Sequence, residues 1–215
     1  MTEPVKPRRA YDASRRQEQA RENRGRVLAA AHRLFAEHGY AGTSLATVAR
    51  EAGVSVQTVY GGFSTKLNLL KQVVDVGLAG DDEPVPMAGR EASRAIEAEP
   101  DPARTLARYA EQVRVVGTRV WPVLLVVYRA AAQDPAVARL AGELDRQRLA
   151  GMTMLARNLM GKPGMDPALT LEEVRDVLWT FNSPELYDLL VVRRGWSPEQ
   201  YESWLARSWS RLLLA

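Results

Sequence analysis

Apolar residues recur with the spacing of helices along most of the chain. Between about residues 17 and 38, five of them fall at i, i+1, i+4, i+7 and i+8, which is one stripe of a helix: Val27, Leu28, Ala31, Leu34 and Phe35. Gly39 follows, where a left-handed cap would stop the helix. No stretch alternates apolar and polar residues with the period of a β-strand. The pattern predicts an all-α fold.

Hydroxyl residues that can cap helices precede three further apolar stripes. A short helix that starts at Thr43 or Ser44 is predicted to end at Gly53. Two more helices are predicted to start after Ser55 and after Thr65, and the second of these runs to about residue 77.

The rest of the chain is predicted to be helical as well. Residues 80 to 102 are rich in Pro, Ala and acidic residues, which is typical of a connector with one short helix at most. Helical patterns then cover residues 103–118, 121–132, 135–160, 170–181, 184–194 and 198–214. Start signals for the last four of these are Asp134, Thr170, Ser183 and Ser197. We therefore expect a flexible basic arm (1–16), an N-terminal helical domain (17–79) and a C-terminal helical domain (80–215), because residues 1–16 hold too little apolar surface to order themselves.

Composition narrows the possible functions. Hydrophobic residues make up 46% of the chain, enough to bury a core, and no apolar run is long enough to span a membrane. Nothing in the sequence resembles a secretory signal, so a cytoplasmic protein is expected. Cysteine is absent, which excludes disulfides and thiolate zinc sites. The two histidines, His32 and His38, point in different directions on one helix, so we expect no metal site and no cofactor.

Positive charge is concentrated near the N-terminus. Residues 1–70 hold 11 Lys and Arg against 6 Asp and Glu, a net charge of +5, whereas the remainder holds 18 against 20, a net charge of −2. Such an excess suits a polyanion such as DNA, and a solvated basic surface explains it equally well.

The two helices that flank Gly53 have the arrangement of a helix-turn-helix. In such a unit the second helix can lie in a DNA major groove about 12 Å wide, although a plain helical hairpin has the same spacing. The wider pattern decides between them, because residues 24–70 resemble the DNA-binding domain of the TetR family of bacterial transcription repressors. The residues that carry the resemblance are Ala36-Glu37-His38-Gly39-Tyr40, Thr43-Ser44-Leu45, Val48-Ala49, Ala52-Gly53-Val54-Ser55, Thr58-Val59-Tyr60, Phe63, Lys66 and Leu69-Leu70.

The resemblance implies that the helix after Ser55 reads DNA. Gln57 is then placed to pair with adenine and Val56 to touch a thymine methyl group. Four residues occupy positions that resemble phosphate contacts, although the first is also a possible N-cap and the last a possible solvated charge: Thr43, Thr58, Tyr60 and Lys66. The whole implied DNA surface consists of Thr43, Ser44, Ala46, Ser55, Val56, Gln57, Thr58, Tyr60, Gly61, Gly62 and Lys66.

Three positions of that surface depart from the family pattern. Gly61 and Gly62 stand where relatives often carry polar side chains, and Ala46 stands where many carry a long polar or basic one. The glycines either stop the helix or allow backbone to approach phosphate closely. Few direct base contacts are therefore expected. Arginines of the arm offer a compensating minor-groove contact, or only salt-dependent attraction: Arg8, Arg9, Arg15 and Arg16.

The C-terminal part resembles the family's ligand-binding and dimerisation domain. Helices over 103–132, 135–160 and 170–181 would wall a cavity for an apolar or aromatic small molecule, although most of their aromatic residues are expected to be core. The candidate lining residues are Tyr109, Trp121, Tyr128, Met152, Trp179 and Asn182.

The last two long helices, Leu171 to Val192 and Pro198 to Leu214, resemble the family's dimer-forming pair. They carry more apolar surface than one thin layer of core requires, at Leu178, Leu186, Leu189, Leu190, Trp204, Leu205, Trp209, Leu212 and Leu213. The resemblance thus implies a homodimeric, ligand-responsive repressor with a palindromic operator. An architectural or adaptor protein without an effector is the alternative, and an all-helical enzyme is disfavoured because no catalytic set of residues is found.

Overall fold

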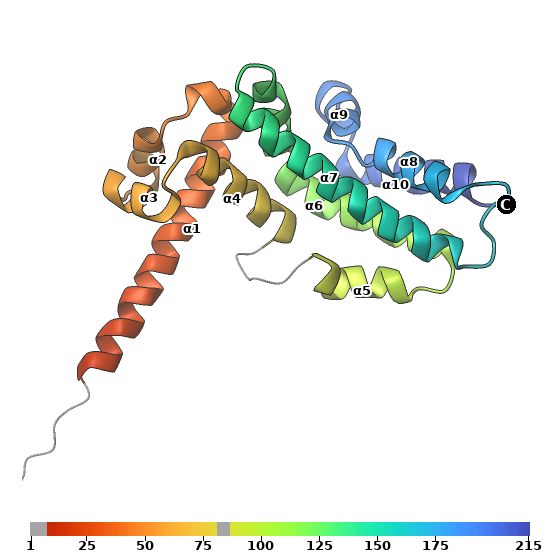
Figure 1. Ribbon diagram of the computed structural model, residues 1–215, viewed down its shortest axis with the longest axis horizontal. Helices are drawn as coiled ribbons and strands as arrows, with labels where there is room; N and C mark the ends of the chain where they lie inside the picture. Colours follow the sequence, from red (N-terminus) through yellow and green to blue (C-terminus); the bar gives the residue numbers. More distant parts are fainter. Residues whose placement is uncertain (1–7, 81–86) are drawn as a thin grey trace, which may run out of the picture. The chain divides into compact units, whose positions relative to one another are not determined.

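The computed structural model describes residues 8–80 and 87–215, and the regular structure in these residues is entirely helical (Figure 1). The predicted all-α fold is confirmed. The chain divides into two compact units, one up to Val73 and one from Val74 to Ala215.

The first unit packs short helices against one long helix. It contains α1 (Arg8–Gly42), α2 (Leu45–Ala52), α3 (Val56–Phe63) and the beginning of α4 (Lys66–Ala79). Gly39 interrupts α1 with a positive φ of 70°, although its ψ of −179° is not that of the predicted left-handed cap. The apolar stripe forms the core, where Val27, Phe35 and Val48 are almost fully buried.

The N-terminal segment differs from the expected arm. Residues 8–16 are helical, since α1 begins at Arg8, and residues 1–7 lie outside the described residues. The apolar content of this segment is too low to bury a surface, but a helix that is already nucleated by a packed core can extend without one. Its residues 15–22 are all exposed.

The second unit is built around a long central helix. It contains the end of α4, η1 (Met87–Gly89), α5 (Glu91–Ala98), α6 (Pro102–Ala131), α7 (Pro135–Met160), α8 (Leu171–Phe181), α9 (Pro184–Tyr187), the π-helix η2 (Asp188–Arg193) and α10 (Pro198–Leu213). Helix α6 packs against α5, α7, α9 and α10, and α7 packs against α8. Asp134, Thr170, Ser183 and Ser197 cap the helices that they were predicted to start.

Two helix predictions in this unit are wrong. Residues 103–118 and 121–132 belong to one helix, α6, which contains Pro122. The helix continues past the proline although Pro122 has no N–H for the helical ladder. Conversely, Leu171 to Val192 is not one long helix, in agreement with the separate patterns 170–181 and 184–194. Asn182 leaves helical geometry (φ −85°, ψ 57°), and Ser183 then caps α9.

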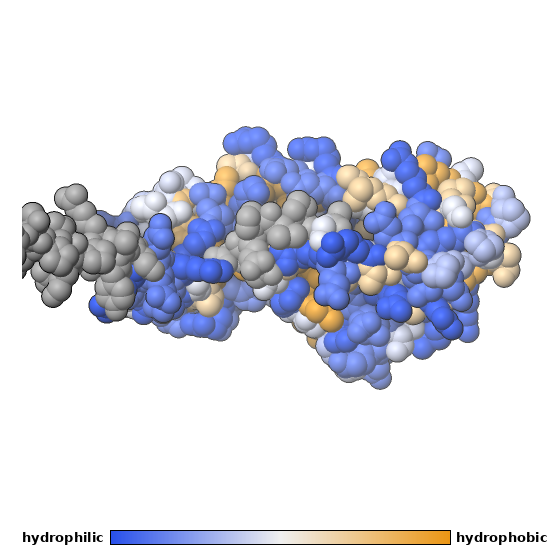
Figure 2. Space-filling view, turned by 90° about the horizontal axis from the view of Figure 1, so that it is seen from below, coloured by the Kyte–Doolittle hydropathy of each residue, from blue (hydrophilic) through white to orange (hydrophobic). Residues whose placement is uncertain are grey.

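Aromatic side chains fill much of the core between α6 and the C-terminal helices. The Trp121 ring lies 4.5 Å from the Tyr187 ring and 5.7 Å from the Tyr201 ring, measured between centroids. No helix in the described ranges 8–80 and 87–215 is long and apolar enough to cross a membrane. Hydrophilic residues predominate on the face shown in Figure 2, with hydrophobic residues scattered in small patches.

Candidate nucleic-acid interface and ligand-binding core

The turn between α2 and α3 is fixed by local hydrogen bonds. Ser44 accepts a bond from the Thr47 N–H at 3.0 Å and Ser55 accepts one from the Thr58 N–H at 3.1 Å, so each serine caps its helix. Between them Gly53 adopts the left-handed conformation (φ 64°, ψ 38°) and donates its N–H to the end of α2. This glycine makes the short reversal possible.

Helix α3 turns one side to the core and the other to solvent. Val59 and Phe63 are 0% and 2% exposed, whereas Val56 and Tyr60 are 39% and 55% exposed. Gln57 and Thr58 are exposed as well. The outer side therefore offers an amide, a hydroxyl, a phenol and an apolar group, which is the chemistry needed to contact base edges and phosphates.

The two glycines are part of α3 and do not stop it. The helix runs to Phe63, and Ser64 ends it with φ 59°. A Cβ added to Gly61 or Gly62 would meet no atom within 4 Å. The outer side of α3 consequently lacks two side chains for which there is space, and its backbone is open to close approach at this end.

Two of the expected phosphate contacts are engaged within the domain. Thr43 is 2% exposed and its hydroxyl bonds to the carbonyl oxygens of Leu34 at 3.0 Å and Gly39 at 2.9 Å. Ser44, not Thr43, is the N-cap of α2, and the Thr43 side chain is not presented to a ligand. The Lys66 ammonium donates to the Tyr40 carbonyl oxygen at 2.8 Å and lies 4.2 Å from the centre of the Tyr40 ring.

The sequence of this unit matches a known family. Residues 27–73 fit the profile described as "Bacterial regulatory proteins, tetR family". These residues belong to the TetR family. The TetR-family match explains why a capped α2, a glycine turn and an exposed α3 occur together, and it indicates a DNA-binding transcriptional regulator.

Solved structures with the same fold extend over both units. The native crystal structure of NalD, the secondary repressor of the MexAB-OprM multidrug efflux pump in Pseudomonas aeruginosa, aligns with a TM-score of 0.68 and 22% identity over 91% of this chain and 98% of that chain. A transcriptional regulator from Rhodococcus sp. Rha1 aligns with a TM-score of 0.59 and 22% identity over 88% of this chain and 95% of that chain. No curated protein sequence matches the chain. The TetR-family unit is thus joined to a C-terminal unit whose fold these regulators share.

Five of the six residues proposed to line a ligand cavity lie in one polar network. The Asn182 amide donates to the Tyr109 hydroxyl at 2.9 Å, and that hydroxyl donates to the Met152 sulfur at 3.4 Å. Burial raises the pKa of Tyr109, so its hydroxyl remains a donor.

Arg148 connects this group to the remaining two residues. Its guanidinium donates to the carbonyl oxygens of Trp179 at 2.7 Å and Asn182 at 2.8 Å, and it lies 4.2 Å from the centre of the Trp179 ring. Arg148 also pairs with Asp145, which accepts a 2.8 Å bond from the Tyr128 hydroxyl. Burial and this bond raise the pKa of Tyr128.

Trp121 does not join the network. It is 4% exposed and belongs to the aromatic core with Tyr187 and Tyr201. Burial raises the pKa of Tyr201, whose hydroxyl donates to the Phe181 carbonyl oxygen at 3.1 Å. Trp121 is therefore a packing residue here.

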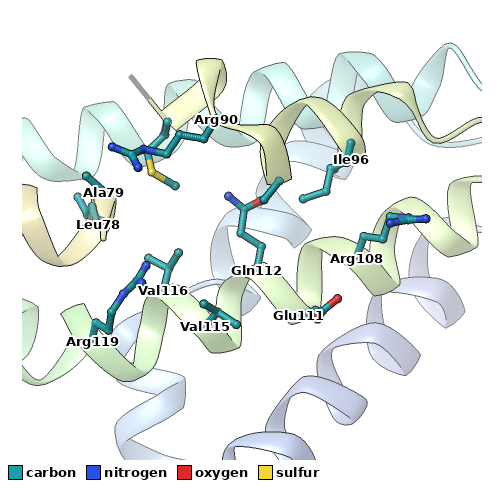
Figure 3. Close-up of a pocket in the computed structure, with 13 residues that line it drawn as sticks. Leu78, Ala79, Arg90, Ile96, Arg108, Glu111, Gln112, Val115, Val116 and Arg119 are labelled. Carbon is teal, nitrogen blue, oxygen red and sulfur yellow. The ribbon is translucent and has the colours of Figure 1, made fainter. Parts of the chain in front are cut away.

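A pocket of about 290 Å³ is lined by none of the residues of the polar network (Figure 3). Its walls come from the end of α4, from η1, from α5 and from α6, so the predicted walls α7 and α8 take no part in it. Sequence reasoning missed this site because residues 80–102 were interpreted as a connector. The signal that could have indicated it is a face of α6 on which two valines lie among polar residues. The residues of this face, at i, i+4, i+7, i+8 and i+11, are Arg108, Gln112, Val115, Val116 and Arg119.

One basic residue near α3 was also missed. The Arg24 guanidinium of α1 lies 5.3 Å from the centre of the Phe63 ring, at the end of α3 where Gly61 and Gly62 lack side chains. Its position before the first buried residue, Val27, carries no sequence signal that separates it from the other arginines of α1.

Proposed function

We propose that the chain is a dimeric repressor of transcription that binds a palindromic operator through α3 and is released by a small-molecule effector. The exposed side of α3, in a unit of the TetR family, carries the proposal. NalD, which shares the fold, is a repressor, and this supports repression over activation.

Gln57 and Val56 are assigned to base edges, and Thr58 and Tyr60 to phosphates. All four side chains are exposed on the first two turns of α3. Ser44, Ala46 and Ser55 are exposed nearby in sequence, but the two serine hydroxyls already cap helices and contribute to positioning. Recognition therefore depends on few direct contacts, with Gly61 and Gly62 offering only backbone.

Selection of bound sites from random double-stranded DNA with the full-length protein tests this assignment. We expect a palindromic site, a general loss of affinity for Tyr60→Ala, and relaxed preference at one base pair per half-site for Gln57→Ala. Gln147→Ala is the matched control, because Gln147 is exposed on α7 in the other unit. If both α3 variants bind every site with the affinity and sequence preference of the parent, α3 is not the helix that recognises DNA.

The proposed dimer interface uses the surface of the last helices. Leu189 and Leu212 are 47% and 48% exposed, and Val192 is 62% exposed. The other apolar residues proposed for this interface include four that are fully buried within the protomer and form its own core: Leu178, Leu205, Trp209 and Leu213. The proposed interface therefore contains fewer residues than the sequence suggested. It also includes the half-buried residues Leu186, Leu190 and Trp204.

An effector changes DNA affinity only if it binds the DNA-competent and DNA-incompetent states unequally. Helix α4 offers a physical link for such a difference, because Lys66 at its start binds Tyr40 while Leu78 and Ala79 at its end line a pocket. A molecule in that pocket contacts the same helix whose first turn is anchored to the DNA-binding unit.

A further inference from the structure

Helix α3 carries no charged residue, although it is the helix assigned to DNA. Its sequence, VQTVYGGF, offers polar and apolar groups only. Binding to duplex DNA depends largely on cations placed against phosphates, so the positive charge that holds α3 in a groove has to come from neighbouring elements. Lys66 is one such cation, and its ammonium is already bonded to the Tyr40 carbonyl oxygen. A cation beside α3 with available donors would supply what α3 lacks.

Arg24 of α1 is held against the end of α3. It precedes the buried residues Val27 and Leu28 by three and four positions, so it extends the core-facing stripe of α1 by one turn. Its guanidinium lies 5.3 Å from the centre of the Phe63 ring, within the range of a cation–π contact. Phe63 is 2% exposed, whereas Arg24 is half-buried. The Arg24 side chain therefore lies partly on the core and partly in solvent.

The donors of this guanidinium are not used within the described part of the chain. Among residues 8–80 and 87–215, the Arg24 side chain contacts the Phe63 ring and forms no hydrogen bond or ion pair. Arg33 on the same helix differs, because its guanidinium binds the Glu51 carboxylate at 2.8 Å. A guanidinium that rests on a ring keeps its N–H groups in its own plane, where an acceptor such as a phosphate can approach them.

The end of α3 leaves room for a DNA backbone beside Arg24. Gly61 and Gly62 are exposed there, and a Cβ at either position would meet no atom within 4 Å. Helix α1 continues past this point toward the N-terminus, so Arg24 lies inside a helix and its backbone is fixed on both sides (Figure 1). A helix in a major groove about 12 Å wide has a phosphate strand on each side, so a cation beside the helix meets phosphates and not base edges.

We infer that Arg24 binds an operator phosphate beside the end of α3, where Gly61 and Gly62 allow the DNA backbone to approach. This contact rests on the proposed function, because it takes α3 as the helix that lies in the groove. It adds to the DNA surface a residue of α1, which precedes the helix-turn-helix. Because a phosphate carries no sequence information, Arg24 positions the protein on DNA and does not select bases.

The salt dependence of DNA binding by the full-length protein tests the contact. On a site selected from random DNA, Arg24→Gln should weaken binding about tenfold per half-site, because a charge-assisted contact is lost. The slope of log K against log salt concentration should become shallower by about 0.9 per half-site, and the sequence preference should be unchanged. Arg24→Lys should keep the slope and most of the affinity. A changed preference at one base pair would make Arg24 a base contact and overturn the inference.

Two further variants separate a phosphate contact from packing and from total charge. Arg24→Met covers the Phe63 ring without a charge and should lose as much DNA affinity as Arg24→Gln. Arg33→Gln removes the same charge nine residues away, on nearly the opposite side of α1, and should change affinity less than about twofold. Parental affinity and slope in Arg24→Met, or equal losses in Arg24→Gln and Arg33→Gln, overturn the inference.

Neutral methylphosphonates, placed one at a time along each half-site, locate the contact. At one phosphate the replacement should weaken binding by the parent and leave binding by Arg24→Gln unchanged, because the two changes remove the same interaction. Losses that add to that of Arg24→Gln at every phosphate overturn the inference.

A duplex of random sequence at low salt distinguishes this contact from the proposed function. If no site is selected by the parent but Arg24→Gln binds the random duplex more weakly than the parent does, the phosphate contact holds and the operator does not exist. If a palindromic site is bound equally by the parent and Arg24→Gln, the contact alone is wrong. If the parent binds no duplex at all, both are wrong.

Discussion

Gly61 and Gly62 hold helical geometry in α3 at an energetic cost. Both are exposed, neither has positive φ, and a Cβ at either position would meet open space. We therefore expect Gly61→Ala and Gly62→Ala each to raise the free energy of unfolding by about 0.5–1 kcal/mol, measured by urea denaturation. Gly53→Ala is the control with the opposite sign, because φ 64° strains any residue with a Cβ. A loss of stability in both α3 variants would contradict a helical end of α3 in solution.

Thr43 is a structural residue whose hydroxyl is satisfied inside the first unit. Thr43→Val leaves the carbonyl oxygens of Leu34 and Gly39 without this donor, so we expect a loss of about 1–2 kcal/mol in the free energy of unfolding. DNA affinity of the folded fraction should remain that of the parent. Gel-shift titration alongside Tyr60→Ala checks this. If Thr43→Val loses DNA affinity while its stability is unchanged, Thr43 contacts DNA.

Local residue chemistry was predictable and long-range partners were not. Ser44, Ser55 and Gly53 act within three or four residues of themselves, so sequence spacing was sufficient to assign them. The Thr43 hydroxyl instead bonds to Leu34, nine residues away, and the Lys66 ammonium bonds to Tyr40, twenty-six residues away. These bonds require the packing of α1 against its neighbours, which no local pattern encodes.

Helix α6 packs a large side chain of one residue over a glycine four residues earlier in the same helix. The Trp121 indole lies over Gly117, where an added Cβ would be 2.3 Å from its ring. Both residues are buried. We expect Gly117→Ala to lower the free energy of unfolding by about 1–3 kcal/mol, because neither the tryptophan nor the helix backbone can move aside freely.

Gly151→Ala is the matched control for Gly117→Ala. Gly151 is also a mid-helix glycine, in α7, but a Cβ there would meet no atom within 4 Å. Alanine at this position should stabilise the protein, so thermal unfolding should shift in opposite directions for the two variants. Stabilisation by both would mean that Trp121 does not pack on Gly117.

At the scale of elements, cap signals predicted helix starts well, and proline was a poor guide to helix ends. Asp134, Thr170 and Ser197 mark real starts because capping depends on adjacent residues. Pro122 did not end α6, since the burial of the helix on both sides outweighs the lost hydrogen bond. The break at Asn182 falls between the separate helical patterns 170–181 and 184–194, whereas the π-helix after it has no comparable sequence signal.

At the scale of the molecule, the sequence indicated only in part which candidate ligand-lining residues lie close together. Tyr109, Met152 and Asn182 lie together, but the Tyr109 hydroxyl bonds to the other two, and Arg148 binds the Asn182 carbonyl oxygen. The pocket arises from the way α5 lies beside α6, which depends on tertiary contacts such as Gln112 with Ser93. The amphipathic pattern of a helix shows which of its faces turns inward. It does not show where the inner faces of two helices leave a pocket between them.

The proposed dimer depends on the apolar residues that the protomer leaves exposed. Leu189 of η2 and Leu212 of α10 lie on elements that pack against each other, and about half of each side chain is accessible. We expect the double variant Leu189→Glu, Leu212→Glu to be monomeric by light scattering at concentrations where the parent is a dimer. Because both side chains reach solvent in the protomer, its helix content should be unchanged.

The same double variant distinguishes the contribution of dimerisation to DNA affinity from the contribution of α3. A protomer can still place one α3 in a groove, so half-site binding should persist, while affinity for the full palindrome should fall at least about tenfold because the second half-site is no longer linked to the first. Met154→Glu introduces a charge at another exposed apolar residue, 57% accessible on α7, and should leave both properties unchanged. If Met154→Glu instead gives monomers and the double variant remains dimeric, the interface lies on α7 and not on η2 and α10.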